Sequence, residues 1–168
     1  MYKLVISIGK YKTYMCMRGT LTLLNKWDER FISVAQEVSS WSKDPSKQIG
    51  CVAVKDKRTI ATGFNGFPRD IEDTEERLND RDLKYKYVVH AEMNCIYNAS
   101  YHGVSLKDST MYIYGLPVCS ECAKGIIQAG VKRVVWKAIN DIPVRWLESN
   151  MLSQELFAEA GVEYDRVH

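Results

Sequence analysis

The sequence has few histidines and no long apolar run, and its cysteine count is odd. The three histidines, His90, His102 and His168, limit the possible imidazole ligands. Five cysteines without a secretory signal argue against a disulfide framework and for a reducing, cytoplasmic environment. No apolar stretch reaches the length of a membrane span. Residues 1–9 are largely apolar, but lysines follow them and no small-residue cleavage site is present, so we predict no signal peptide.

A strong charge of one sign is also missing. The 23 basic residues nearly balance the 21 acidic ones, which leaves a net charge of +2. Proteins that bind nucleic acid usually carry a marked basic excess, because phosphate contacts dominate their affinity. The balance therefore favours a small-molecule substrate. The length of 168 residues is suited to one globular domain with a substantial core.

Apolar spacing predicts an α/β fold. Asn25 is a candidate N-cap for a helix that ends near residue 42, and residues 49–54 and 59–63 form an expected hairpin around a polar turn. Helices are then expected at about 90–98, 119–129 and 143–160, and strands at 110–114, 132–136 and 162–164. The alternation after the hairpin implies right-handed crossovers. We therefore predict a mixed five-stranded sheet, with its first two strands antiparallel and helices on both faces.

Two helices and two further segments carry specific expectations. Helical spacing predicts one apolar face from Trp27, Phe31, Val34, Ala35, Val38 and Trp41, and a second from Leu147, Met151, Leu152 and Leu156. Residues 70–86 are dense in charges of both signs, so a solvated insertion is expected. Residues 1–25 are read as an extension of unknown role with a short strand near 2–8, and residues 26–168 as the main domain.

One histidine and one cysteine pair have the spacing of a metal site. His90 starts a predicted helix, and Cys119 and Cys122 lie three residues apart at the start of another. An imidazole and two thiolates suit Zn²⁺ and leave its fourth position open for water. Glu92, two residues after His90, is placed to carry that water's proton. This pattern is close to the signature of zinc deaminases, H-x-E followed by P-C-x-x-C.

Other interpretations of the cysteine pair stay open. Cys-x-x-Cys alone also occurs as a redox pair at a helix start. A structural zinc site would need a fourth protein ligand, for which the candidates are Cys51, Cys95 and His102. Cys51 lies within a predicted strand, and His102 is expected at the surface. We favour the three-ligand catalytic site.

Several motifs together resemble the deoxycytidylate (dCMP) deaminase family within the cytidine/deoxycytidylate deaminase superfamily. They are Ser42–Ser46, Gly63–Pro68, His90–Asn94, Cys119–Lys124 and Ile127–Val134. The resemblance covers about residues 27–135, and the compact chain is similar to bacteriophage members. One departure is visible, because Val118 stands where the superfamily commonly has Pro directly before the first cysteine. The resemblance implies the three-layer α-β-α fold of cytidine deaminases.

The resemblance also implies function. It implies a hydrolase that converts dCMP to dUMP and ammonia for thymidylate synthesis, in the cytoplasm or in a phage host's cytoplasm. It further implies a homohexamer that dCTP activates and dTTP inhibits, with Mg²⁺ on the bound effector. The matching motifs imply that Glu92 is the catalytic residue and that zinc is bound by His90, Cys119 and Cys122. They imply substrate binding by Asn65, Lys43, Ser46 and Tyr114, and effector binding by Gly63, Phe64, Gly66 and Arg69.

Two kinds of alternative remain. The enzyme could deaminate another substrate, such as free cytidine, deoxycytidine or adenosine in transfer RNA. It could also be a binding module in which zinc is structural and nucleotide is only sensed. A carboxylate beside an open metal position argues against the second alternative, since a structural site has no use for it.

Overall fold

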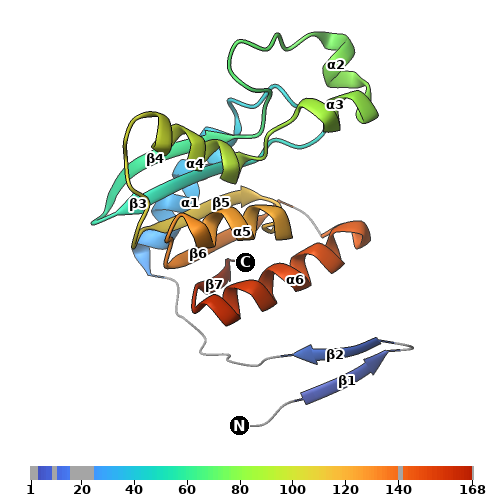
Figure 1. Cartoon of the computed structure of the whole chain (residues 1–168), viewed down its shortest axis with the longest axis vertical. Coiled ribbons are helices and arrows are strands. Elements are labelled where there is room, and N and C mark those ends of the chain that lie inside the picture. Colours follow the sequence, from blue (N-terminus) through green and yellow to red (C-terminus); the bar gives the residue numbers. More distant parts are fainter. Residues whose placement is uncertain (1–3, 9–10, 16–24, 140–141, 168) are drawn as a thin grey trace.

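The chain folds around a mixed five-stranded sheet. The structure is a computed structural model that describes residues 4–8, 11–15, 25–139 and 142–167 (Figure 1). The strands of the sheet lie in the order β4-β3-β5-β6-β7. Their bounds are β3 Gly50–Lys55, β4 Arg58–Phe64, β5 Thr110–Gly115, β6 Arg133–Ala138 and β7 Glu163–Val167. The helices are α1 Lys26–Ser39, α2 Glu75–Asn79, α3 Arg81–Tyr87, α4 Ala91–Tyr101, α5 Ser120–Gln128 and α6 Val144–Ala160.

Strand directions agree with the prediction. β3 pairs antiparallel with β4 and with β5, whereas β5, β6 and β7 are parallel. Asp56 and Lys57 turn the β3–β4 hairpin with φ of 51° and 61°. Two positive φ values match the right-handed twist of the strands they join. Because β3 is antiparallel to both β4 and β5, these two strands run in the same direction. Their carboxyl ends therefore lie at the same edge of the sheet.

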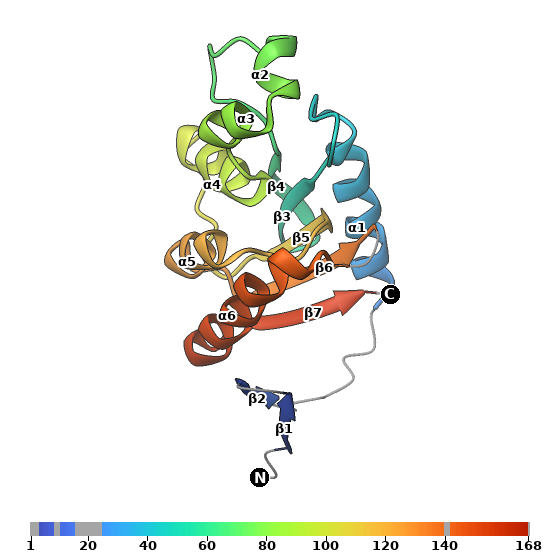
Figure 2. The same ribbon diagram turned by 90° about the vertical axis from the view of Figure 1, so that its right-hand side faces the viewer.

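Helices cover both faces of the sheet, as Figure 2 shows. Helix α1 buries Phe31, Ile32, Ala35 and Val38 against one face. Helices α4, α5 and α6 cover the other face, where the larger core cluster lies. The predicted apolar face of α1 is only partly right, because Trp27, Val34 and Trp41 are each more than a third exposed.

A buried ion pair ties α1 to the sheet. Asn25 caps α1, and Asp28 completes a capping box with it. The Asp28 carboxylate is fully buried and accepts hydrogen bonds from Tyr112 Oη at 2.8 Å and Arg133 Nη1 at 2.8 Å. Burial alone would raise the pKa of Asp28, but the hydrogen bonds from Arg133 and Tyr112 outweigh burial and lower it. The first helix is thereby fixed to β5 and β6.

The charged insertion is folded and is not wholly solvated. Residues 70–86 contain the short helix α2, capped by Thr74, and most of α3, capped by Asp80. Most of its side chains are exposed or half-buried, as expected, but Lys84 is only 7% exposed. Both short helices lie beyond the end of the sheet, next to the start of α4 (Figure 1). The insertion therefore stands where it can form a wall above that edge.

Helix α6 contradicts the predicted apolar face. Leu147, Met151 and Leu152 are 42–46% exposed, and only Leu156 packs against the core. The buried residues of α6 are instead Asn150, Ser153 and Phe157. The helix contacts α5 and β7. Its inner face combines apolar side chains that pack on the core with polar ones, because Ser149 and Ser153 meet backbone groups at the start of α5 that need hydrogen-bond partners.

The N-terminal segment contains the strand expected near residues 2–8. β1 Leu4–Ile8 pairs antiparallel with β2 Tyr11–Met15 in a separate two-stranded sheet. Residues 1–3 and 16–24 lie outside the described part. That residues 1–25 form an extension from the catalytic domain stays a prediction. Within the described ranges, no helix combines the length and apolar character needed to cross a bilayer.

Candidate metal centre and its cavity

His90 is placed at the start of α4 by a short backbone bridge. It is the N-cap residue, with φ −67° and ψ 153°. Just before it, Val89 pairs with Gly66, since Val89 N donates to Gly66 O at 2.8 Å and Gly66 N donates to Val89 O at 3.2 Å. Gly66 follows the end of β4. The histidine is thus anchored at the carboxyl end of that strand.

The two cysteines lie at the start of α5, just after β5. Cys119 is the N-cap, and its Sγ accepts the N–H of Cys122 at 3.5 Å. His90 Nδ1 lies 3.4 Å from each sulfur, and the three donor atoms lie within 4.8 Å of one another. Donors at tetrahedral Zn–N and Zn–S bond lengths are about 3.6 Å apart. The donor set and its spacing therefore fit Zn²⁺.

Hydrogen bonds and helix ends favour a thiolate beside the imidazole. Hydrogen bonds from Cys122 and then from His90 lower the pKa of Cys119 to about 4 despite its burial. The hydrogen bond to Cys119, helped by the charge of Glu92, raises the pKa of His90 to about 9. The hydrogen bond with Cys119 and burial raise the pKa of Cys122. The four described cysteines form no disulfide, so Cys119 and Cys122 are not joined to each other.

Glu92 lies in the first turn of α4 beside these donors. Its side chain is almost fully buried, at 4% exposed, and it lines the same cavity as His90 and Cys119. Burial raises the pKa of its carboxyl group, whereas the charge of His90 lowers it. Among the described residues the donor cluster comprises His90, Cys119 and Cys122, without Cys51, Cys95 or His102. A carboxyl group thus stands next to a site with three protein ligands.

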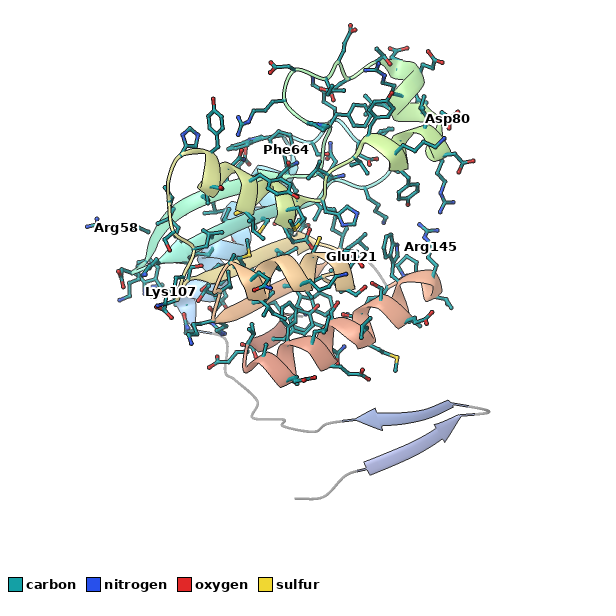
Figure 3. All side chains as sticks on the ribbon, viewed as in Figure 1. Arg58, Phe64, Asp80, Lys107, Glu121 and Arg145 are labelled. Carbon is teal, nitrogen blue, oxygen red and sulfur yellow. The ribbon has the colours of Figure 1, made fainter. Side chains whose placement is uncertain are left out.

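A cavity of about 240 Å³ opens above the donors. Its floor is formed by the starts of α4 and α5, and its walls come from the 44–49 loop, Asn65, the insertion and the start of α6. The lining residues are Asp44, Ser46, Lys47, Ile49, Asn65, Asn79, Arg81, Lys84, Tyr85, Val88, His90, Ala91, Glu92, Leu116, Pro117, Cys119, Arg145 and Trp146. Arg145 extends from the first turn of α6 on the side that faces α3 (Figure 3).

Two of the expected substrate residues, Asn65 and Ser46, line this cavity. Asn65 is 6% exposed, and its Oδ1 accepts the N–H of Ile49 at 2.7 Å. Its Nδ2 donates to Lys47 O at 2.9 Å. Asn65 therefore also holds the 44–49 loop in place.

The other two expected substrate residues lie outside the lining. Lys43 is exposed and pairs with Asp73 at 2.8 Å. Tyr114 packs on the α1 side of the sheet, opposite the larger cluster that contains Cys119 and Cys122. The structure thus brings Asn65 and Ser46, but not Lys43 or Tyr114, to the metal donors.

The four expected effector residues also lie outside the cavity lining, and each makes packing contacts. Gly63 lies directly against the first turn of α4, where an added Cβ would lie 2.4 Å from Ala91 O. Phe64 packs edge-on against Trp41, with ring centroids 6.2 Å apart. Gly66 forms the bridge to Val89, and Arg69 hydrogen-bonds Asn98 and stacks over Tyr101. Their effector role stays a prediction.

The buried lysine of the insertion was missed from sequence. Lys84 Nζ lies 2.9 Å from Asp44 Oδ1 and 3.1 Å from Ser46 Oγ, so α3 is attached to the 44–49 loop. Both side chains of this ion pair are about a tenth exposed. Nothing in the local sequence distinguishes Lys84 from the other charges around it. The cavity wall from Asn79 to Tyr85 was missed for the same reason.

The site and fold define a zinc deaminase, and the comparisons identify the family. Residues 25–138 match the family profile described as "Cytidine and deoxycytidylate deaminase zinc-binding region", so the chain belongs to the cytidine and deoxycytidylate deaminase family. The predicted family is thereby confirmed. The matched region ends at Ala138, before α6 and β7.

Relatives within this family include named deoxycytidylate deaminases. The mouse deoxycytidylate deaminase is 40% identical over 145 residues, covering 83% of this chain and 78% of the mouse protein. The "Uncharacterized deaminase in luxG 3'region" of Aliivibrio fischeri is 38% identical over 142 residues, covering 84% and 93%. The chain covers 56% of the probable deoxycytidylate deaminase of Caenorhabditis elegans, to which it is 42% identical.

A solved structure confirms the predicted fold class. The dCMP deaminase of the cyanophage S-TIM5, crystallised in complex with dCMP and dUMP, aligns with a TM-score of 0.68 at 24% identity. The alignment covers 86% of this chain and 99% of that chain. The two proteins therefore share the α/β fold with its central sheet.

Proposed function

We propose that the protein is a zinc-dependent hydrolase that converts dCMP to dUMP and ammonia. The observation that carries the proposal is the convergence of three metal donors and one buried carboxyl group at the floor of a cavity. Family membership supports the reaction class, and the relatives named deoxycytidylate deaminase support the substrate.

His90, Cys119 and Cys122 would hold the metal, and Glu92 would move protons. Zinc held by these residues would supply a Lewis acid that polarises water and lowers its pKa. Glu92 would accept a proton from that water as the water's oxygen bonds to the ring carbon that bears the amino group. It would pass this proton to the adjacent ring nitrogen. It would then transfer the second proton of the water's oxygen to the departing amino group, which leaves as ammonia.

The charges of the cavity support a phosphorylated substrate. Four basic side chains line it, from Lys47, Arg81, Lys84 and Arg145, against the carboxylates of Asp44 and Glu92. Asp44 already pairs with Lys84. This excess of positive charge suits a 5′-phosphate far better than an uncharged nucleoside, because Arg and Lys form charge-assisted hydrogen bonds with phosphate oxygens.

Asn65 and Ser46 would contact the sugar and phosphate from the opposite wall. Both line the cavity, and a hydroxyl or carboxamide there can bond a nucleotide oxygen. Lys43 and Tyr114 are left out of this proposed binding mode, because neither is among the residues that line the cavity.

The proposal extends to regulation and assembly on the strength of the family resemblance. It includes activation by dCTP, inhibition by dTTP with Mg²⁺, a homohexamer, and supply of dUMP for thymidylate synthesis in the cytoplasm. Initial rates with dCMP, measured with and without each effector and Mg²⁺, test the regulation. Hyperbolic rate curves that are unchanged by dCTP and dTTP would refute the proposed regulation and leave the catalytic proposal unaffected.

One experiment tests the catalytic proposal. Ammonia release is measured for dCMP, dCTP, deoxycytidine, CMP and an adenosine-containing transfer RNA, alongside the zinc content. We expect dCMP to be the preferred substrate and a chelator to remove zinc and activity together. A preference for a nucleoside or for RNA would show that dCMP is not the substrate. Zinc binding without deamination of any of these compounds would indicate the non-catalytic alternative.

A variant separates the carboxyl group's role from metal binding. Glu92→Gln should retain zinc and lower kcat about 10²- to 10⁴-fold, the usual contribution of a general acid–base. The matched control is Glu121→Gln, on the exposed side of α5, whose carboxylate pairs with Lys124. Normal turnover by Glu92→Gln would refute the proposed proton transfer.

A further inference from the structure

We propose that α6 and β7 position the Cys119 metal ligand through Ser149, Ser153 and Tyr164, which bind the backbone on both sides of that cysteine. The inference deepens the proposed function, since it rests on the same metal centre. It concerns residues after Ala138, beyond the region that matches the family profile. These three residues are called the α6–β7 clamp below.

Ser149 binds the peptide that follows Cys119. Its Oγ accepts the N–H of Ser120 at 2.9 Å and lies 3.1 Å from Ser120 Oγ. Ser120 is the first residue of α5, so its N–H has no acceptor within the helix. With this N–H satisfied from α6, the sulfur of Cys119 is left to accept the N–H of Cys122 and to bind metal.

Tyr164 binds the peptide that precedes Val118. Tyr164 Oη accepts the N–H of Val118 at 3.2 Å and donates to Asn150 Oδ1 at 3.2 Å. The signature of zinc deaminases has proline at the position of Val118, and proline has no N–H to satisfy. Val118 is fully buried, so its N–H needs a partner inside the protein. Tyr164 supplies that partner.

The ring of Tyr164 is itself fixed. It stacks on Trp136 with centroids 5.8 Å apart and contacts Phe157 at 5.0 Å. Burial raises its pKa, so the hydroxyl stays protonated and can donate to Asn150 while it accepts from Val118. A rigid acceptor therefore stands opposite the Val118 peptide.

Ser153 binds the carbonyl of the peptide between Val118 and Cys119. Its Oγ lies 2.9 Å from Val118 O and 2.9 Å from Ser149 O. A hydroxyl has one hydrogen, so the Ser153 hydroxyl donates to one of these two carbonyls at a time. Ser149 O is the carbonyl four residues earlier in the same helix. Ser153 is fully buried and offers Val118 O a partner from α6.

Together the clamp accounts for three backbone groups that flank one ligand. These are the N–H and C=O of Val118 and the N–H of Ser120. A ligand must be held within about 0.5 Å of its productive position to serve a site well. Groups that orient ligands typically contribute 10- to 100-fold to metal affinity or activity. The clamp should therefore contribute to zinc affinity, although none of its side chains reaches the metal donors.

The double variant Ser149→Ala/Tyr164→Phe tests the clamp. Zinc affinity is measured by competition with a chromophoric chelator, and the site geometry by the absorption bands of the Co²⁺-loaded protein. We expect the zinc dissociation constant to rise about 10- to 100-fold and the thiolate–Co²⁺ bands to shift. Tyr164→Phe alone keeps the ring between Trp136 and Phe157, and it provides the test should the double variant fail to fold.

The control carries truncations at exposed positions of α6 and α4, Gln154→Ala and Tyr97→Phe. It should keep the parent dissociation constant and bands, and Ser149→Thr, which retains the hydroxyl, should do the same. A double variant with the parent's zinc affinity and Co²⁺ spectrum would overturn the inference. Neither readout needs a substrate, so a parent that fails to deaminate dCMP would refute the proposed function and leave this result standing.

Discussion

Gly63→Ala offers a sharp test of how the site is built, because β4 and α4 touch at this glycine. A Cβ at Gly63 would lie 2.3 Å from Cys95 N and 2.4 Å from Ala91 O. These two atoms belong to the first two turns of α4, the helix that begins after His90. The obstacle is helix backbone, which cannot rotate away as a flexible side chain could.

The displacement follows from these distances. A Cβ practically never comes closer than 3.0 Å to such an atom, so β4 and α4 must separate by at least 3.0 − 2.3 = 0.7 Å. Overpacking of this kind costs about 1–3 kcal/mol in free energy of unfolding. Each kcal/mol lowers Tm by about 2–4 °C for a domain of this size, so we expect a fall of about 2–12 °C. Zinc affinity should fall too, since His90 is the N-cap of α4 and would be displaced with that helix.

The assay is thermal unfolding of the zinc-loaded protein, with Gly66→Ala as the matched control. A Cβ at Gly66 meets only the ring of Phe64, at 3.6 and 3.8 Å, which are ordinary contact distances. That variant should keep the parent Tm. Because the family resemblance implies effector binding for both glycines, the result separates a packing role from an effector role. An unchanged Tm for Gly63→Ala, with an altered response to dCTP or dTTP, would refute the packing argument.

Two further predictions concern charged groups. Arg133→Ala leaves the buried Asp28 carboxylate without its ionic partner and should cost about 3–5 kcal/mol, whereas Lys132→Ala at an exposed position should cost little. Because the folded-state pKa of Asp28 is lowered, its stabilising contribution is complete above the ordinary value of 3.8 and is lost as pH falls through the folded-state pKa. The acid limb of Tm against pH should therefore move to higher pH in Arg133→Ala, and an unmoved limb would count against the ion pair. Arg145→Ala should raise KM for dCMP about 10- to 100-fold and leave deoxycytidine unaffected, and equal changes for both would show that Arg145 does not contact the phosphate.

The metal donors could be predicted because two local patterns specify them. Cys119 caps α5 and Cys122 follows in its first turn, so their sequence spacing alone brings them to one side. His90 reaches them because β4 and β5 run parallel, which brings the chain after each strand to the same edge. The alternation of strands and helices predicted the hairpin and the parallel strands after it, but the place of β3 between β4 and β5 comes from the structure.

The cavity wall could not be predicted, because its partners are distant in sequence. Lys84 is buried only because Asp44, 40 residues earlier, supplies a carboxylate for it. A buried ammonium without such a partner would be strongly unfavourable, so local charge density predicts exposure. The same limit applies to Tyr114, whose place in the β5 strand was predicted but whose face depends on register. β5 directs Tyr112 and Tyr114 toward α1, and Met111 and Ile113 toward the metal side.

Helix α6 shows why apolar periodicity fails where a helix covers a loop. Leu147 and Met151 share one side by spacing, but Asn150, Ser153 and Phe157 share another, and it is the second side that is buried. A helix on a sheet meets apolar side chains, because the backbone of the sheet is already paired. A helix on the start of another helix meets the unpaired N–H groups of that start and the carbonyls of the loop before it, so polar residues are favoured there. The informative pattern is therefore Ser149, Asn150 and Ser153 at i, i+1 and i+4, followed by Gly161 and then Tyr164. A search for apolar periodicity alone does not detect it. This pattern indicates a helix that holds another segment in place.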